Sequence, residues 1–279
     1  MVNYNGNIVP TTGLSLEANR GFLYGDAIFD TLKVLDGKVL FSEDHYFRLM
    51  ASLRIVRMEI PLYFTLEYME TEVLSIVAAL NLSASARVRI TFFRKPGGKY
   101  TPETNETEFV ITAEPLETLL YAVNESEYEV ELYKDFYITK QLVSTIKTTN
   151  RILNTTAAIF ASENGYNSCL MVNDDKNVIE AIQGNVFMLT GNRLVTPPVS
   201  DGCLNGIMRK QLIEIAKKIE GIEFVEASIS PFDLQKADEI FITNVITGIQ
   251  PVTRYRKKTY KSDLSKELVK RLNAKVRLG

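Results

Sequence analysis

The sequence predicts an α+β protein built from two domains. Short strand-like segments are mixed with amphipathic helical segments, without the strict strand–helix alternation of a parallel α/β sheet. A chain of 279 residues is also longer than one average domain. An acidic stretch without clear periodicity, 114–127, separates the two halves. We therefore expect two domains, at 1–118 and 119–279.

The first domain is expected to combine four short strands with two helices. Turn residues or alternating apolar residues mark the strands, which are 3–9, 37–41, 87–93 and 108–113. Between them lie two segments with apolar residues at helical spacing. Ser42 is expected to cap the first helix, which runs to about Met58. Thr65 is expected to cap the second, which stops at Asn81.

The second domain is expected to contain more strands. They are 128–133, 168–172, 178–180, 186–189, 194–196, 222–229 and 239–245. One helix follows Lys147 and ends at Asn164 and Gly165, because glycine accepts the left-handed backbone of a helix C-terminus. Gly206 opens an amphipathic helix, and Ser262 caps the last one.

Composition and charge exclude several classes of function. The net charge of −2 offers no electrostatic attraction for nucleic acid or anionic lipid. The longest apolar run, 73–80, is far shorter than the ~18–20 residues that span a bilayer, and no signal peptide is visible. Two cysteines, Cys169 and Cys203, and one histidine, His45, cannot build a Cys/His zinc site. We therefore expect a cytoplasmic enzyme or binding protein that uses no metal, nucleic acid or membrane.

The segment 201–209 places two glycines directly before a predicted helix. Free backbone N–H groups and the positive end of the helix dipole make such a place suitable for an anion. The spacing matches neither the phosphate-binding lysine motif nor the three-glycine dinucleotide motif. An anion site and an ordinary glycine turn are therefore both open interpretations, and the spacing alone favours the turn.

Three cations and one carboxylate also have two interpretations each. Arg87 and Arg89 are two residues apart in a strand, so they share one face and suit a carboxylate ligand or a solvated sheet surface. Lys147, among small polar residues, suits either a Schiff base or an ordinary surface charge. Glu180 ends an apolar strand, where it is either a partly buried carboxylate with a partner or a residue in water.

Eight short motifs follow one another along nearly the whole chain. They are 24–30, 45–49, Lys147 with Asn150, 180–185, 196–198, 205–209, 237–241 and 251–252. In this order they resemble the class IV pyridoxal-phosphate enzymes, which include branched-chain aminotransferases, D-amino-acid aminotransferases and aminodeoxychorismate lyases. The resemblance implies fold type IV, the two-domain D-amino-acid aminotransferase-like fold. It implies that 1–118 is an α/β sandwich and 119–279 a β-barrel-like α+β domain, with the cofactor pyridoxal 5'-phosphate between them.

The resemblance also assigns roles to individual residues. It implies that Lys147 binds the cofactor covalently and later moves the proton. It implies that Glu180 pairs with the pyridine nitrogen and keeps it protonated, so that the ring can accept electrons. The implied phosphate contacts are Arg48 and the main chain at Ile207, Met208, Asn244 and Val245.

The substrate implied by the resemblance is a small carboxylate or amine, and the assembly is a homodimer. The residues expected at the substrate are Tyr24, Phe29, Arg87, Arg89 and Arg94. In the homodimer, the loop 96–100 of one subunit would border the site of the other.

The branch of the family is predicted from local strings. Ile152 stands near the place where branched-chain enzymes carry a tyrosine, and no histidine follows His45 to form the arginine–histidine loop of D-amino-acid enzymes. The strings most similar to the lyases are 94–100, 147–151, 205–209 and 243–244. The stretch 245–250 departs from the lyase pattern. We predict an aminodeoxychorismate lyase, with a transaminase of branched-chain or D-amino acids as the alternative and a non-catalytic anion-binding protein as a third.

Overall fold

The computed structural model describes residues 1–278, and the chain separates into two compact units. The first unit, unit 1, consists of Met1–Leu119 and Ile146–Asn150. The second, unit 2, consists of Leu120–Thr145 and the described residues from Arg151 onward. The expected range of the second domain, 119–279, included the short segment Ile146–Asn150, which belongs to unit 1 instead.

This segment belongs to unit 1 because its backbone pairs with a strand of that unit. The Phe29 N–H donates to the Lys147 carbonyl at 2.8 Å, and the Thr149 N–H donates to the Ala27 carbonyl at 3.0 Å. The Ile146 side chain is buried in the core of unit 1. Local sequence could not reveal this excursion, because the pairing partners lie about a hundred residues away.

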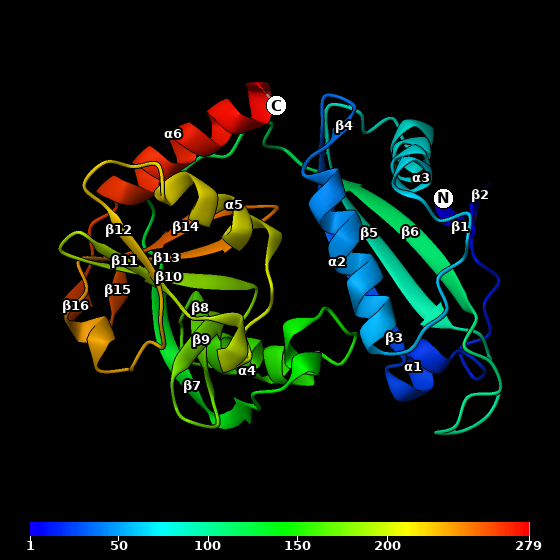
Figure 1. Ribbon diagram of the computed structural model, residues 1–279, viewed down its shortest axis with the longest axis horizontal. Helices are drawn as coiled ribbons and strands as arrows, with labels where there is room; N and C mark the ends of the chain where they lie inside the picture. The colour runs from blue at the N-terminus through cyan, green and yellow to red at the C-terminus, as the bar shows by residue number, and fades with distance from the viewer. Residues whose placement is uncertain (279) are drawn as a thin grey trace. The chain divides into compact units, whose positions relative to one another are not determined.

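Unit 1 is an antiparallel six-stranded sheet in the order β2-β1-β6-β5-β3-β4. The strands are β1 Val2–Tyr4, β2 Asn7–Val9, β3 Ala27–Leu35, β4 Lys38–Val39, β5 Ser85–Arg94 and β6 Thr107–Pro115. The helices are α1 Arg20–Tyr24, α2 Ser42–Ile55 and α3 Leu66–Ala79. Figure 1 shows α2 lying along this sheet.

The apolar core of unit 1 lies on one face of the sheet. Alternate side chains of β3 and β5, such as Leu32 and Ile90, pack against α2 and α3. Residues directly opposite in antiparallel strands share a face. The pairs Phe29↔Thr91 and Thr31↔Arg89 therefore lie on the other face. The helices α2 and α3 do not cover this face, which carries polar and charged side chains.

The two predicted helix caps of unit 1 have different outcomes. Thr65 caps α3, since its hydroxyl accepts a hydrogen bond from the Tyr68 N–H at 3.2 Å, as predicted. Ser42 does not cap α2, and that prediction was wrong. Phe41 occupies the cap position with φ of 54° and without a side-chain bond, so that Ser42 is already the first helical residue.

Unit 2 is built on a ten-stranded mixed sheet whose longest path is β12-β11-β10-β9-β8-β7-β15-β16, with β13 pairing to β10 and β14 (Figure 1). The strands are β7 Glu129–Ile138, β8 Ser168–Asn173, β9 Val178–Ala181, β10 Gly184–Thr190, β11 Arg193–Thr196, β12 Glu223–Glu226, β13 Glu239–Asn244, β14 Gly248–Val252, β15 Arg254–Tyr255 and β16 Lys258–Thr259. The α-helices are α4 Ile152–Glu163, α5 Ile207–Ala216 and α6 Asp263–Leu278, and the 3-10 turns are Leu142–Thr145, Val199–Asp201 and Asp233–Gln235.

The overall class is α+β, as predicted. The β-barrel-like description of the second domain stays a prediction, since the strand pairing describes a branched sheet. Within residues 1–278, no helix has the length and apolar character needed to cross a membrane.

Candidate active site

Lys147 is held by its main chain at the edge of β3. Its ammonium nitrogen lies 4.8 Å from the centroid of the Phe29 ring. The segment is fastened further by Asn150, whose amide donates to the Gly25 carbonyl at 3.0 Å. Gly25 has φ of +63°, which favours glycine, and a Cβ there would lie 2.2 Å from the Asn150 amide oxygen, so a larger residue would displace that side chain. The lysine thus extends from a rigid support.

Arg89 contacts the same aromatic ring. Its guanidinium carbon is 3.7 Å from the Phe29 centroid, a cation–π contact. Phe29, which is itself buried, therefore contacts both a lysine and an arginine on the sheet face opposite α2 and α3. Arg87 shares this face but pairs with Glu114 at 2.6 Å, and both side chains are exposed. Arg89 is the better placed of the two to hold a carboxylate beside Lys147.

Arg48 is oriented by a buried carboxylate. Its Nε donates to Asp30 Oδ2 at 3.0 Å and its Nη2 to Asp30 Oδ1 at 2.5 Å, from α2 to β3. His45, which is 1% exposed, places Nδ1 3.2 Å from the same Oδ1. Burial raises the pKa of Asp30, but the charge of Arg48 and the contact with His45 outweigh it, so that the pKa lies well below its usual value. Asp30 is therefore an anion that fixes the guanidinium bidentately.

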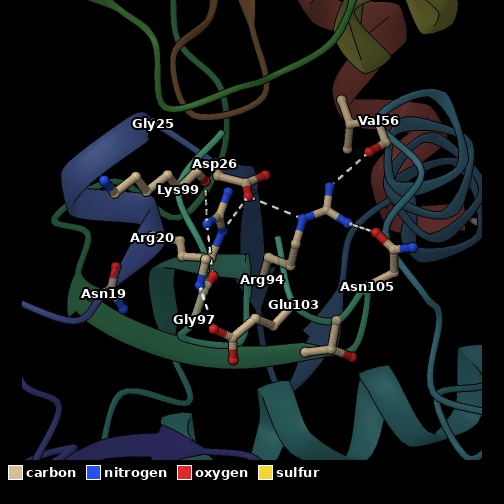
Figure 2. A network of polar contacts seen from close by, with 12 residues as sticks. Asn19, Arg20, Gly25, Asp26, Val56, Arg94, Gly97, Lys99, Glu103 and Asn105 are labelled. Atoms are coloured by element: carbon tan, nitrogen blue, oxygen red, sulfur yellow. Dashed lines mark hydrogen bonds and ion pairs between the residues drawn. The ribbon is translucent and has the colours of Figure 1, made fainter. Parts of the chain in front are cut away.

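Arg94, expected at the substrate, has most of its guanidinium donors bound by protein groups (Figure 2). Its Nε donates to Asp26 at 3.0 Å, and Nη2 donates to the Val56 carbonyl at 2.9 Å. Its Nη1 donates to the Arg57 carbonyl and to the Asn105 side chain. The side chain is buried. These bonds give Arg94 a supporting role in the chain, and its contact with substrate stays a prediction.

The same network fixes the loop between β5 and β6. Asp26 also accepts from Arg20 Nε at 2.9 Å, and Arg20 Nη1 donates to the carbonyls of Gly97 and Lys99 (Figure 2). Beside this loop the exposed rings of Tyr24 and Tyr100 lie 5.8 Å apart. Contact of Tyr24 with substrate stays a prediction.

In unit 2, Glu180 is a buried carboxylate with a main-chain partner. It is 5% exposed on β9, and its Oε2 accepts from the Leu204 N–H at 2.9 Å. The amide of Asn185 donates to the Leu204 carbonyl at 2.8 Å. Of the two interpretations from the sequence, the buried carboxylate is therefore the one that the structure supports.

The start of α5 lies three residues beyond Leu204. Its cap residue, Gly206, has no side chain to accept from the first-turn N–H groups, and both Ile207 and Met208 are buried. A Cβ at Gly206 would lie 2.0 Å from the Asn185 amide oxygen. One short segment therefore contains both Leu204, the partner of Glu180, and a helix N-terminus without a side-chain cap. The free N–H groups of such a helix start suit an anion.

A row of cross-strand pairs connects these groups to the β13–β14 turn. Asn185 pairs with Glu180 on one side and with Thr243 on the other. The Thr243 hydroxyl is buried without a hydrogen-bond partner. Asn244 follows and shapes the turn, because its side-chain oxygen accepts from the N–H groups of Ile246 and Thr247. The carboxylate, the helix start and the turn are thus gathered in one part of unit 2.

Comparison with known proteins identifies the family. The sequence model of class IV aminotransferases matches residues 27–255. A putative branched-chain-amino-acid aminotransferase of Methanocaldococcus jannaschii is 30% identical, over 93% of this chain and 88% of the relative. The chain belongs to the class IV aminotransferase family. Like the rest of this family, it is a pyridoxal-phosphate enzyme.

Two further matches show the range of this class IV family. An aminodeoxychorismate lyase of Vibrio harveyi is 26% identical, over 88% of this chain and 89% of the relative. A crystal structure of the branched-chain amino acid aminotransferase of Thermobaculum terrenum in its PLP form has a TM-score of 0.84 and 21% identity, covering 99% of this chain and 93% of that one. The fold is that of the fold-type IV aminotransferases.

The residues of this class IV aminotransferase fit the cofactor. The buried Glu180 carboxylate suits a protonated pyridine nitrogen, and the uncapped α5 start suits a phosphate. The orphaned Thr243 hydroxyl adds a donor that a buried phosphate would satisfy. Among residues 1–278, no cluster of three or more His, Cys, Asp or Glu side chains could hold a metal.

Sequence reasoning missed several residues that support this site. Asp30, Asp26, Asn185 and Thr243 were not candidates. Asp30 carried a weak signal, since it interrupts an otherwise apolar strand and a buried carboxylate requires a partner. The other three lie within the strings 24–30, 180–185 and 243–244, but their individual roles follow only from their partners in the fold.

Proposed function

We propose that this class IV enzyme is a 4-amino-4-deoxychorismate lyase, which releases pyruvate to give 4-aminobenzoate. The observation that carries the proposal is the position of Lys147 and Arg89 about the Phe29 ring, with a base beside a carboxylate-binding group. Two of the lyase-like strings, 147–151 and 94–100, lie at positions that the structure fixes. Residues 147–150 belong to the segment that supports Lys147, and Arg20 binds the Gly97 carbonyl in the loop after Arg94. The Vibrio harveyi relative carries the lyase name.

Each part of the cofactor has its own candidate group in the chain. Lys147 would bind it covalently, Glu180 would hold the proton on the pyridine nitrogen, and Arg48 would bind the phosphate. Main-chain groups at Ile207, Met208, Asn244 and Val245 would complete the phosphate contacts. When bound, pyridoxal phosphate supplies an electron sink for the carbon next to the substrate nitrogen.

Each protein group then has one task. Arg89 binds a substrate carboxylate and orients the ring, and the Phe29 face excludes water on that side. Lys147 removes the ring proton beside the substrate nitrogen. The C–O bond to the enolpyruvyl group breaks as the ring becomes aromatic, and the departing enolpyruvate takes up a proton to become pyruvate. Glu180 stays ionised throughout, so that the pyridine nitrogen keeps its proton.

A transaminase is the second candidate, favoured by the 30% identity with a putative branched-chain aminotransferase. In that reaction Lys147 would return the proton to the cofactor, and a keto acid would leave. For either reaction we propose a homodimer, because the exposed Tyr24 and Tyr100 rings form an apolar surface that a second copy would cover.

Product analysis separates the two candidates. We expect purified enzyme to release pyruvate from aminodeoxychorismate without any keto-acid acceptor. Arg89→Ala should impair this release more than Arg87→Ala, which serves as the matched control from the same strand face. If transfer occurs only between amino acids and keto acids, tested with L and D panels, the lyase proposal fails and the transaminase replaces it.

A further inference from the structure

We propose that Tyr121 is a positioning residue that fixes the β13–β14 turn for the cofactor phosphate, with Asn273 of α6 as its support. The inference rests on the proposed role of Asn244 and Val245. Tyr121 is 5% exposed, and its hydroxyl donates to the Val245 carbonyl at 2.8 Å. The two residues are 124 positions apart, so the contact joins the beginning of unit 2 to a turn near its end.

The Tyr121–Val245 hydrogen bond is one of two bonds that fix the same peptide group. The peptide between Val245 and Ile246 has its oxygen bound by Tyr121 and its N–H bound by the Asn244 side chain at 3.0 Å. A peptide plane held at both ends cannot flip without breaking a hydrogen bond. The adjoining Asn244–Val245 main chain, the proposed phosphate contact, is therefore held in one orientation.

The tyrosine ring also determines where the turn lies. Gly248 ends the turn with φ of +77°, and a Cβ there would lie 2.6 Å from Tyr121 Cδ1. The ring thus occupies the space that any other residue at position 248 would need. The ring contact with Gly248 and the hydrogen bond to Val245 therefore act at opposite ends of the same turn.

Tyr121 itself is fastened from α6. Its N–H donates to the Asn273 side-chain oxygen at 3.1 Å, and the Asn273 amide donates to the Tyr121 carbonyl at 2.8 Å. Burial raises the pKa of Tyr121 far above neutrality, so the phenol remains a donor at physiological pH. The C-terminal helix therefore supports the phosphate turn through one buried side chain.

Tyr260 offers a matched control. Its hydroxyl donates to the Leu234 carbonyl at 2.7 Å, so Tyr260→Phe removes the same kind of bond from the same unit, away from the turn. The measurement is the Kd of the apoenzyme for pyridoxal phosphate and for pyridoxal, which lacks the phosphate, together with the thermal midpoint of each apo variant.

We expect Tyr121→Phe to weaken pyridoxal phosphate binding about threefold to tenfold, the range of one hydrogen bond. Pyridoxal binding should change by less than about twofold, because only the phosphate depends on the turn. Tyr260→Phe should change neither Kd. Asn273→Ala should also weaken pyridoxal phosphate binding. If Tyr121→Phe does not fold, Asn273→Ala tests the proposal in its place.

Three outcomes overturn the inference. One is an equal loss of pyridoxal phosphate and pyridoxal binding in Tyr121→Phe, which indicates a general structural role. Another is an equal effect of Tyr121→Phe and Tyr260→Phe. The third is a wild-type preference for pyridoxal phosphate that neither Tyr121→Phe nor Asn273→Ala reduces. A wild-type enzyme that binds both compounds equally would instead contradict the proposed phosphate contacts themselves.

Discussion

Unit 1 and unit 2 hold their candidate functional groups by different means. In unit 1 cations are oriented by buried carboxylates, as Asp30 orients Arg48 and Asp26 joins Arg94 to Arg20. In unit 2 the bonds go to main-chain groups: the Glu180 carboxylate accepts from the Leu204 N–H, the Asn185 amide donates to the Leu204 carbonyl, and the Tyr121 hydroxyl donates to the Val245 carbonyl. Unit 1 should therefore respond most strongly to the loss of a charge, and unit 2 to changes in backbone position.

Lys147→Ala should have the largest effect and should separate function from folding in unit 1. The substitution removes both the covalent anchor and the base, so turnover should fall by several orders of magnitude. The main-chain bonds of Lys147 and Thr149 remain, so the unfolding midpoint should change little. Turnover, the yellow colour of bound cofactor, and borohydride labelling of Lys147 in the wild type check this. A coloured, active variant would remove Lys147 from the site.

Asp30→Asn should destabilise unit 1 by about 3–5 kcal/mol, because it leaves the Arg48 charge buried without its anion. Glu114→Gln, which breaks the exposed Arg87 pair, is the control and should cost less than about 1 kcal/mol. Urea unfolding measures both. Similar losses in the two variants would mean that burial does not distinguish these pairs.

The same pair predicts a pH dependence. The folded-state pKa of Asp30 is lowered, so its stabilisation is present above the unfolded pKa of about 4 and is lost as pH falls toward the folded value. Asp30→Asn should therefore flatten the acid limb of the stability curve. An unchanged acid limb would contradict this contribution of Asp30.

Glu180→Gln tests unit 2, where charge and backbone position can be separated. A glutamine oxygen can still accept from the Leu204 N–H, so the main chain and cofactor binding should persist. Turnover should fall about 10²–10³-fold, because the pyridine nitrogen loses its anionic partner. Single-turnover rates locate the defect in the chemical step. Normal turnover with bound cofactor would exclude Glu180 from catalysis.

Arg89→Ala should have the smallest effect of the four, about 2 kcal/mol in kcat/KM, because the half-buried guanidinium binds substrate without reacting. The yellow colour should remain. Steady-state kinetics beside Arg87→Ala measures the difference. Equal losses for the two arginines would show that the whole sheet face, and not Arg89 alone, captures the carboxylate.

Local sequence patterns determined many of the elements and side-chain faces, although the central strand β3 was not among the expected strands. Thr65 capped its helix, and Arg87 and Arg89 shared a face, because capping and alternation depend on neighbours within a few residues. The ordered motifs indicated the family for the same reason, since each is a short string. Glu180 was recognised as a candidate from its place at the end of an apolar strand.

The tertiary structure alone decided the partners. Arg94 was expected at the substrate, yet Asp26, 68 positions away in sequence, takes its guanidinium. Lys147 joins unit 1 through pairing with β3, and Tyr121 meets Val245 across 124 positions. A cation or a phenol has the same local pattern whichever partner it finds. Strand register and helix packing choose that partner, and they are properties of the whole folded chain.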